Sequence, residues 1–331
     1  MRTLVVSDLH LGASIQHSVL ARPEPLERLL AAVDGVDRLV LLGDIVELLE
    51  RDPARAMEAA EATLRAIGAR VGREREVVLV PGNHDVPLIA AWVRARPTEL
   101  IVDTPIPLNA TAALAAVTGW LSPAQVRVHY PGVWLSDRVW ATHGHYVGRR
   151  VGRRARKDGV RVQPIDYERA SRGLTLHRIE AGIMRALPGP AATLTEDVAE
   201  LARALTMPLP RRLLHRRMSA LTSALLAVQV RRSNIPTLAN VAASLGVDAD
   251  WILFGHVHRL GPLAGDRLLE WQGPRGRPSI ANTGSWVYEP LLVHHATPPH
   301  PYWPGGSVLL EDERPPVARG LLDDLAADAL H

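Results

Sequence analysis

The chain has 331 residues and no cysteine, so it has no disulfide and no thiolate metal site. Any metal ion must therefore be held by His, Asp or Asn. Aromatic residues are also scarce, at 4%. There is no apolar run of about 18 residues, so no transmembrane segment is expected. The N-terminus lacks a basic stretch followed by an apolar one, so we expect no signal peptide and predict a cytoplasmic protein.

Positive charge is concentrated in one part of the chain. Between Arg149 and Arg232 there are 18 Arg and Lys residues against 7 Asp and Glu, a balance of +11, whereas the remainder has a balance of −8. Lysine is almost absent, since Lys157 is the only one. Two regions of opposite charge indicate two parts with different roles.

Strand and helix patterns alternate along the first part of the sequence. Apolar runs typical of buried strands lie at residues 4–6, 39–42 and 77–80. Helical patterns follow these runs, at residues 25–33, 53–68 and, with interruptions, 87–121. This alternation predicts a layered α/β domain.

The second half contains a long stretch without strand patterns. We expect a hairpin at residues 133–142, a strand at residues 251–254, and two further strand ends at residues 279–286 and 307–311. Between residues 146 and 247 we expect helices at residues 164–187, 195–204, 211–230 and 236–245. The predicted organisation is a core domain of residues 1–148 and 248–318, a basic helical insertion or cap at 149–247, and a C-terminal tail at 319–331.

Residues that can bind metal ions follow five of the apolar runs. The motifs are Asp8-x-His10, Gly43-Asp44, Gly82-Asn83-His84-Asp85, His143-Gly144-His145 and Gly255-His256-x-His258. Alternation along a strand would point Asp8 and His10 to the same side. Glycine before several of the motif residues permits tight turns. Imidazole mixed with carboxylate suits Mn, Fe, Zn or Co better than Ca or Mg. Each motif alone is typical of an ordinary turn, but the ordered set predicts a metal site.

As an ordered set, the motifs resemble those of the calcineurin-like metallophosphoesterase family. The resemblance implies an α/β fold, a four-layer αββα-type sandwich, with two divalent metal ions of which manganese is favoured. The implied ligands are Asp8, His10 and His258 for one ion, and Asn83, His143 and His256 for the other. Asp44 would bridge the ions. His84 would be the catalytic histidine beside the phosphate, and Asp85 would orient it.

The implied activity is hydrolysis of a phosphate mono- or diester. Two ions neutralise the charge that develops on the phosphoryl group and acidify the attacking water. Asp44 suits a bridging position because an ionised carboxylate offers two oxygens. His84 can protonate the leaving oxygen because the pKa of imidazole lies near the working range.

The segment around His143 departs from several relatives, which have His-Gly-Asp where this chain has His143-Gly144-His145. We keep His143 as the ligand and interpret His145 as a residue near the metal ligands or the substrate. Arginines follow closely, and Arg149 and Arg150 could bind an anionic substrate through paired hydrogen bonds. The alternative is that these arginines face water.

Other polar residues have two interpretations each. Glu47 follows Asp44 by three positions, and we expect it to cap or solvate a helix start rather than to join the site. Asn282 and Trp286 follow a strand near the motifs, but Asn-Thr-Gly-Ser is also an ordinary turn. A possible third metal site comprises His294, His295 and His300, although exposed loop histidines are the preferred interpretation.

The basic, partly apolar stretch at residues 211–232 could associate weakly with an anionic membrane surface, but packing as a cap helix is favoured. Two rival functions stay open. A nuclease would suit the basic insertion, yet Tyr167 is its only aromatic residue and leaves no platform for stacking bases, so nucleic acid is not the expected partner. An inert scaffold of the same fold could dispense with ligands, whereas every implied ligand position here is filled.

Overall fold

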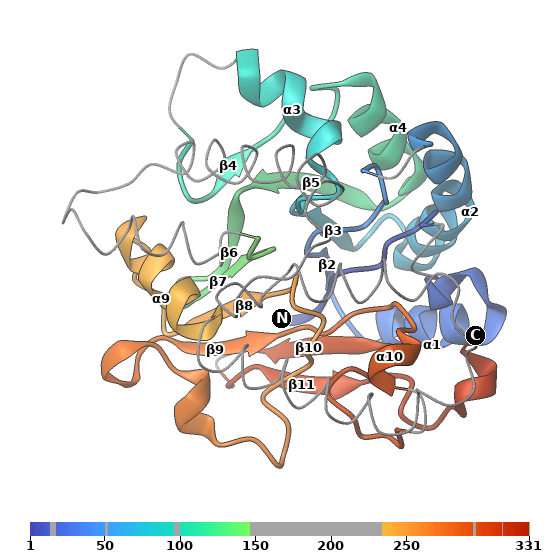
Figure 1. Cartoon of the computed structure of the whole chain (residues 1–331). Coiled ribbons are helices and arrows are strands. Elements are labelled where there is room, and N and C mark those ends of the chain that lie inside the picture. The colour runs from blue at the N-terminus through green and yellow to red at the C-terminus, as the bar shows by residue number, and fades with distance from the viewer. Residues whose placement is uncertain are drawn as a thin grey trace, which may run out of the picture.

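The computed structural model describes residues 1–13, 18–49, 52–95, 100–145, 234–293, 296–312 and 314–330. In this part of the chain two β-sheets pack face to face, and helices cover the outer face of each sheet (Figure 1). The predicted four-layer αββα architecture is confirmed.

The larger sheet has seven strands in the order β11-β10-β1-β2-β3-β5-β4. Its strands are β1 (Arg2–Val6), β2 (Arg38–Leu41), β3 (Glu76–Leu79), β4 (Thr104–Pro105), β5 (Gln125–Tyr130), β10 (Gly306–Glu311) and β11 (Val317–Gly320). Strands β1, β2, β3 and β5 run parallel, whereas β4, β10 and β11 pair antiparallel with their neighbours. The carboxyl ends of the parallel strands therefore meet at one edge, where α/β proteins usually bind ligands.

The smaller sheet has the order β6-β7-β8-β9. Its strands are β6 (Gly132–Ser136), β7 (Val139–Thr142), β8 (Trp251–Phe254) and β9 (Ser279–Asn282). The expected hairpin forms between β6 and β7, and β7, β8 and β9 run parallel. Their carboxyl ends deliver the second set of motifs.

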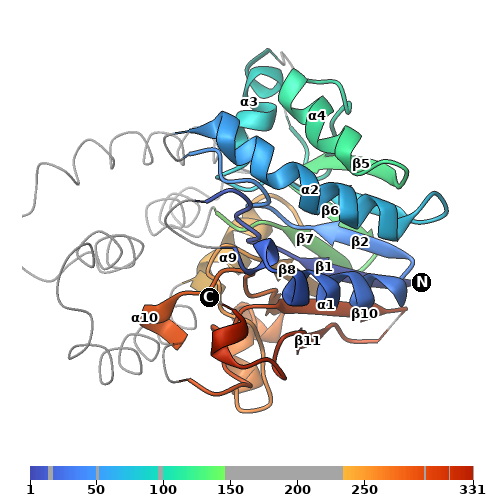
Figure 2. The ribbon, with the colours of Figure 1, turned by 90° about the vertical axis from the view of Figure 1, so that its right-hand side faces the viewer.

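The described helices are α1 (Pro23–Asp34), α2 (Pro53–Val71), α3 (Val86–Ala95), α4 (Ala112–Trp120), α9 (Ile235–Ser244) and α10 (Pro290–Val293). Short 3₁₀ turns complete them, η1 (Val19–Ala21), η3 (Leu268–Trp271), η4 (Pro274–Gly276) and η5 (Ala327–Ala329). Figure 2 shows α1 and α2 side by side on the outer face of the larger sheet.

Alternation along the central strands divides the core into layers. Leu4 and Val6 face the layer beneath helices α1 and α2, whereas Val5 faces the layer between the two sheets. The same division holds in β2, where Leu39 points to the helices and Val40 to the other sheet. Burial on both faces explains why these strands are continuous apolar runs.

Helix α9 forms the fourth layer. Its apolar face, which includes Ile235 and Leu238, packs against Trp140, Phe254 and Ile280 of the smaller sheet. We placed the corresponding pattern, residues 236–245, in the insertion. In the structure this helix is part of the sandwich, because its buried residues pack against the smaller sheet.

Strands β4, β5 and β11 were not predicted. Strand β5 lies after the predicted helical stretch at residues 87–121, in a segment for which we expected no secondary structure. Strand β4 interrupts the helical stretch itself, between α3 and α4. In β5 the residues Val126, Val128 and Tyr130 alternate with Gln125 and other polar residues, which is a strand signal. The polar residues on its exposed face made the run look like a loop.

The described part of the segment that we set apart as a tail, residues 319–330, packs on the core. Leu322, Leu325 and Leu330 are buried, and the Leu322 carbonyl accepts a hydrogen bond from Trp303 Nε1 at 3.0 Å. Residues 319 and 320 belong to β11, which pairs with β10.

Among the described residues, no helix is both long and apolar enough to cross a membrane. The helices expected at residues 164–187, 195–204 and 211–230 lie outside the described residues, as does the basic stretch at 211–232.

Candidate metal centre

The motif residues lie in the loops that follow the strands. Strand β1 ends at Val6, so Asp8 and His10 are not in an extended strand as the alternation argument assumed. Both have positive φ, 55° and 43°, and the turn still brings them to the same side. Five motif residues other than glycine share this left-handed backbone, namely Asp8, His10, Asp44, His256 and His258. Positive φ is unfavourable for residues other than glycine, and such strain gathers at functional sites.

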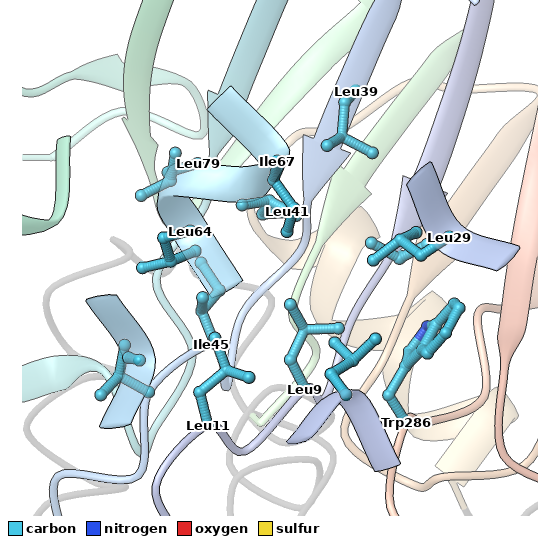
Figure 3. Close-up of a cluster of buried hydrophobic side chains, with 14 of the residues drawn as sticks. Leu9, Leu11, Leu29, Leu39, Leu41, Ile45, Leu64, Ile67, Leu79 and Trp286 are labelled. Carbon is cyan, nitrogen blue, oxygen red and sulfur yellow. The ribbon is translucent and has the colours of Figure 1, made fainter. Parts of the chain in front are cut away.

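Apolar residues between the motif residues hold these loops on the core. Leu9 and Leu11 flank His10 and are buried, and Ile45 follows Asp44. Figure 3 shows all three within the apolar cluster that also contains Leu64 of α2. The polar side chains therefore face the site because their neighbours are fixed in the core.

Two glycines allow the loops to approach each other. Gly43 has φ of 86°, and a side chain there would also overlap the ring of His143. At Gly255, before His256, a Cβ would overlap the carboxylate of Asp8. The role expected for these glycines is confirmed, although at Gly255 the reason is close packing rather than a left-handed turn.

The first group of side chains is Asp8, His10 and His258. All three are buried, and one potential ligand atom of each lies within 4.8 Å of the others. Asp8 Oδ1 is 3.3 Å from His258 Nε2. The carboxylate of Asp8 also accepts hydrogen bonds from the Ser7 hydroxyl and from the His256 backbone N–H. Asp8 is therefore fixed between β1 and β8.

The second group is Asp44, His143 and His256, again within 4.8 Å. Asn83 joins it, since Asn83 Oδ1 is 3.2 Å from His143 Nε2. The rings of His143 and His256 lie edge to face with 5.3 Å between their centroids. The structure thus brings Asn83, His143 and His256 together with Asp44.

Asp44 belongs to the second group and also faces the first. Its Oδ2 is 3.1 Å from His143 Nε2 in the second group and 3.9 Å from His10 Nε2 in the first. Its Oδ1 accepts a hydrogen bond from the His84 backbone N–H at 2.8 Å. One carboxylate thus faces both groups.

His10 Nε2 provides a test of whether a cation fits here. This nitrogen is buried and has no hydrogen-bond partner among the described residues. A buried polar atom without a partner is costly, and His10 Nε2 faces the carboxylates of Asp8 and Asp44. A divalent ion that prefers imidazole and carboxylate ligands fits this arrangement.

Glu47 lies within the cluster, whereas the sequence interpretation placed it outside the site. It is not the N-cap of α2, which begins at Pro53, and its side chain is 3% exposed. Its carboxylate accepts from His10 Nδ1 at 3.1 Å and from His84 Nδ1 at 2.8 Å. Glu47 therefore sets the rotation of two imidazoles.

His84 lies at the edge of this cluster, with its side chain 28% exposed. Its Nδ1 contacts Glu47, so Nε2 is the nitrogen that remains for chemistry. We expected Asp85 to orient this ring, but its carboxylate instead accepts hydrogen bonds from the backbone of Ile45, Val46 and Gly82. Asp85 thus holds together the loops that follow β2 and β3.

Besides His84, three further motif histidines have a hydrogen-bond partner at Nδ1. Glu289 Oε1 is 2.7 Å from His258 Nδ1, Glu47 contacts His10 Nδ1, and His143 Nδ1 donates to the Leu42 carbonyl at 2.9 Å. Such contacts fix the tautomer and leave Nε2 for a metal ion. Glu289 was missed because nothing in its local sequence marks it.

Charge interactions keep the central carboxylates ionised. Burial alone would raise the pKa of Asp44, but the imidazoles of His143 and His84 hold it well below its ordinary value. For Glu47, burial is likewise outweighed by the hydrogen bonds from His10 and His84, which lower its pKa to about 2. Burial and the charge of Asp44 raise the pKa of Asp85 to about 6. Two anionic carboxylates, those of Asp44 and Glu47, therefore face the histidines.

The remaining candidates are less closely tied to this cluster. His145 is buried, with its ring 5.7 Å from that of His143. Asn282 is structural, because its side chain bonds Gly255 O and the Gly284 N–H. Of the supposed third metal site only His300 is described, and it is absent from the clusters with metal-binding geometry found among the described residues. Arg149, Arg150, His294 and His295 lie outside the described residues.

Comparison with known proteins adds one family. The family described as calcineurin-like phosphoesterase matches residues 1–179, which include the motifs up to His143 but not His256 or His258. A solved structure with similarity is YfcE, a phosphoesterase from E. coli, at 15% identity and a TM-score of 0.35, covering 94% of this chain and 89% of that one. A search of curated proteins finds no match.

Proposed function

Since the chain belongs to the calcineurin-like phosphoesterase family, we propose that it hydrolyses a phosphate mono- or diester at a centre of two divalent metal ions. The observation that carries this proposal is the position of Asp44. Its Oδ2 lies 3.9 Å from His10 Nε2 and 3.1 Å from His143 Nε2, so one carboxylate can serve both groups.

We assign Asp8, His10 and His258 to one ion and Asn83, His143 and His256 to the other, with Asp44 shared. The buried, unpartnered Nε2 of His10 supports a cation in the first group. The mixture of imidazole, carboxylate and amide ligands suits Mn, Fe, Zn or Co, and we propose Mn. Once bound, two such ions neutralise phosphoryl charge and lower the pKa of the attacking water.

The chain's own residues complete the reaction. Water loses a proton to solvent and attacks phosphorus, the bond from phosphorus to the leaving oxygen breaks, and His84 Nε2 gives its proton to that oxygen and is reprotonated from solvent. Glu47 keeps the ring in place by accepting from Nδ1 at 2.8 Å. Asp85 fixes the backbone around Asp44 and so acts on the reaction only through the loop.

We propose that the substrate is anionic and that His145, Arg149 and Arg150 contribute to its recognition. His145 adjoins His143 and is followed closely by the two arginines. The balance of +11 between residues 149 and 232 supports the choice of an anionic partner. A cytoplasmic location remains our prediction from the sequence.

The test uses the full chain, stripped of metal and then supplied with Mn²⁺. Phosphomonoesters, diesters, nucleotides, lipid phosphates, DNA and RNA are each assayed, and metal content is measured in parallel. We expect two Mn²⁺ per chain and turnover with at least one phosphoester class. Two bound ions without turnover on any substrate would favour an inert scaffold, and cleavage restricted to DNA or RNA would favour a nuclease.

A further inference from the structure

His258 lies between two carboxylates that come from distant parts of the chain. Its Nε2 is 3.3 Å from Asp8 Oδ1, and its Nδ1 is 2.7 Å from Glu289 Oε1. The side chains of His258 and Glu289 are only 11% and 16% exposed. A hydrogen bond this short and this sheltered restricts the rotation of the ring.

The segment that carries Glu289 is firmly anchored next to the first group. Trp286 is fully buried, its backbone N–H donates to the Asp8 carbonyl at 3.0 Å, and its Nε1 donates to the Gly306 carbonyl at 3.1 Å. Glu289 lies three residues later, directly before α10. Its carbonyl accepts hydrogen bonds from the backbone N–H groups of Leu292 and Val293 in that helix. The same short segment thus contacts the backbone of one proposed ligand and the ring of another.

The partners at Nδ1 differ between the histidines of the first group and His143 of the second group. Both histidines of the first group are backed by carboxylates, His10 by Glu47 and His258 by Glu289. In the second group His143 is backed by the neutral Leu42 carbonyl, and Asn83 is itself neutral. A carboxylate behind a ligand histidine makes the imidazole more basic and fixes its orientation.

We infer that Glu289 is a positioning residue that directs His258 Nε2 to the first cation, so that its carboxylate strengthens binding of the ion held by Asp8, His10 and His258. The inference rests on the proposed function, because it requires the two-ion centre. It concerns metal affinity, so it can be measured without turnover.

The experiment is equilibrium dialysis of the full chain against Mn²⁺ over a range of concentrations, with metal content measured at each. The variants are Glu289→Ala and Glu289→Gln. A matched control is Glu76→Gln. Glu76 has a similar exposure, 22%, and is the first residue of β3, at the end of this strand away from the motif loops. It pairs with Arg127 of β5. Unfolding of the metal-free proteins is recorded alongside.

For wild type and Glu76→Gln we expect two binding steps. In Glu289→Ala one step should weaken by about 10–100-fold while the other is unchanged. Glu289→Gln should fall between, because the amide oxygen still accepts from Nδ1 but carries no charge. Excess Mn²⁺ should restore hydrolysis to both variants.

Unchanged binding in Glu289→Ala would overturn the inference. So would equal weakening of both steps together with lower stability of the metal-free variant, since that indicates general damage to packing. A wild-type chain that binds no Mn²⁺ would instead remove the two-ion centre, which is a failure of the proposed function and is visible before any variant is made.

Discussion

Glu47 and His84 lie in direct contact, with Glu47 Oε1 at 2.8 Å and Oε2 at 2.6 Å from His84 Nδ1. Oε2 of the same carboxylate is also 3.1 Å from His10 Nδ1. One side chain therefore connects a proposed metal ligand to the proposed proton donor, and its loss should affect both binding and chemistry.

Replacing Glu47 by alanine should weaken binding of one Mn²⁺ and also lower kcat at saturating Mn²⁺, each by about 10–100-fold, because two imidazoles lose their acceptor. Metal titration followed by assays at high Mn²⁺ separates the two effects. The matched control is Glu61→Ala, which removes a surface glutamate paired with Arg65. A Glu47→Ala variant that recovers fully at high Mn²⁺ would show that His84 does not depend on Glu47.

His84→Ala should keep both metal ions but lower kcat by about 10²–10⁴, the range for a positioned acid or base. The loss should be smaller for p-nitrophenyl phosphate, since an acidic leaving group needs no proton. Comparing this ester with an alkyl phosphate measures the difference. Loss of a metal ion from the variant would instead make His84 a ligand.

Asp44→Asn should lose one metal ion per chain and nearly all turnover, because the amide replaces the charge that faces both groups. The fold should persist, since the His84 backbone N–H can still donate to the amide oxygen. Metal analysis and circular dichroism test the two expectations. Two ions and normal turnover in this variant would refute the shared role of Asp44.

Leu9→Ala should destabilise the fold by about 2–5 kcal/mol, the usual result of removing a buried leucine side chain. Turnover of the folded fraction should also fall, because Leu9 holds the loop that carries Asp8 and His10. Urea unfolding measures the first effect. Leu269 is 85% exposed, so Leu269→Ala is the control and should change stability by no more than about 0.5 kcal/mol.

Asp103→Asn should make the free energy of unfolding less dependent on pH in the acidic range. Burial alone would raise the pKa of Asp103, but the hydrogen bonds from His129 and from the Trp134 N–H hold it below its ordinary value. Such a carboxylate stabilises the fold above its unfolded pKa of about 3.9, and this stabilisation disappears as pH falls through the lower folded pKa.

The free energy of unfolding of the wild type should therefore exceed that of Asp103→Asn by on the order of 1 kcal/mol at pH 7. The two should converge as the pH falls below about 4. Urea unfolding across this range measures the difference. A gap that stays constant with pH would mean that the charge of Asp103 does not contribute.

The sequence predicted the parts of this molecule that depend on local pattern. Residues such as Asp8 and His10 directly follow apolar runs, and the topology of an α/β sandwich brings such positions together. Strand β5 was not predicted because its exposed face carries polar residues such as Arg127, which make the alternation of Val126 and Val128 hard to recognise.

Contacts between distant segments could not be predicted in this way. Glu289 meets His258 from 31 residues further along, and the contact depends on the turn after β9 rather than on any spacing. Glu47 was visible beside Asp44, but only the structure shows that it contacts two histidines. The role of Asp85 was likewise decided by the loops that surround it.

The left-handed backbone at Asp8, His10, Asp44, His256 and His258 sets a limit on how this protein can change. Strained residues of this kind cost about 1–3 kcal/mol each, and glycine would relieve that cost. A laboratory selection that rewards heat resistance alone would therefore be expected to discard these side chains early. Screening for both thermal tolerance and hydrolysis would direct improvement toward other positions.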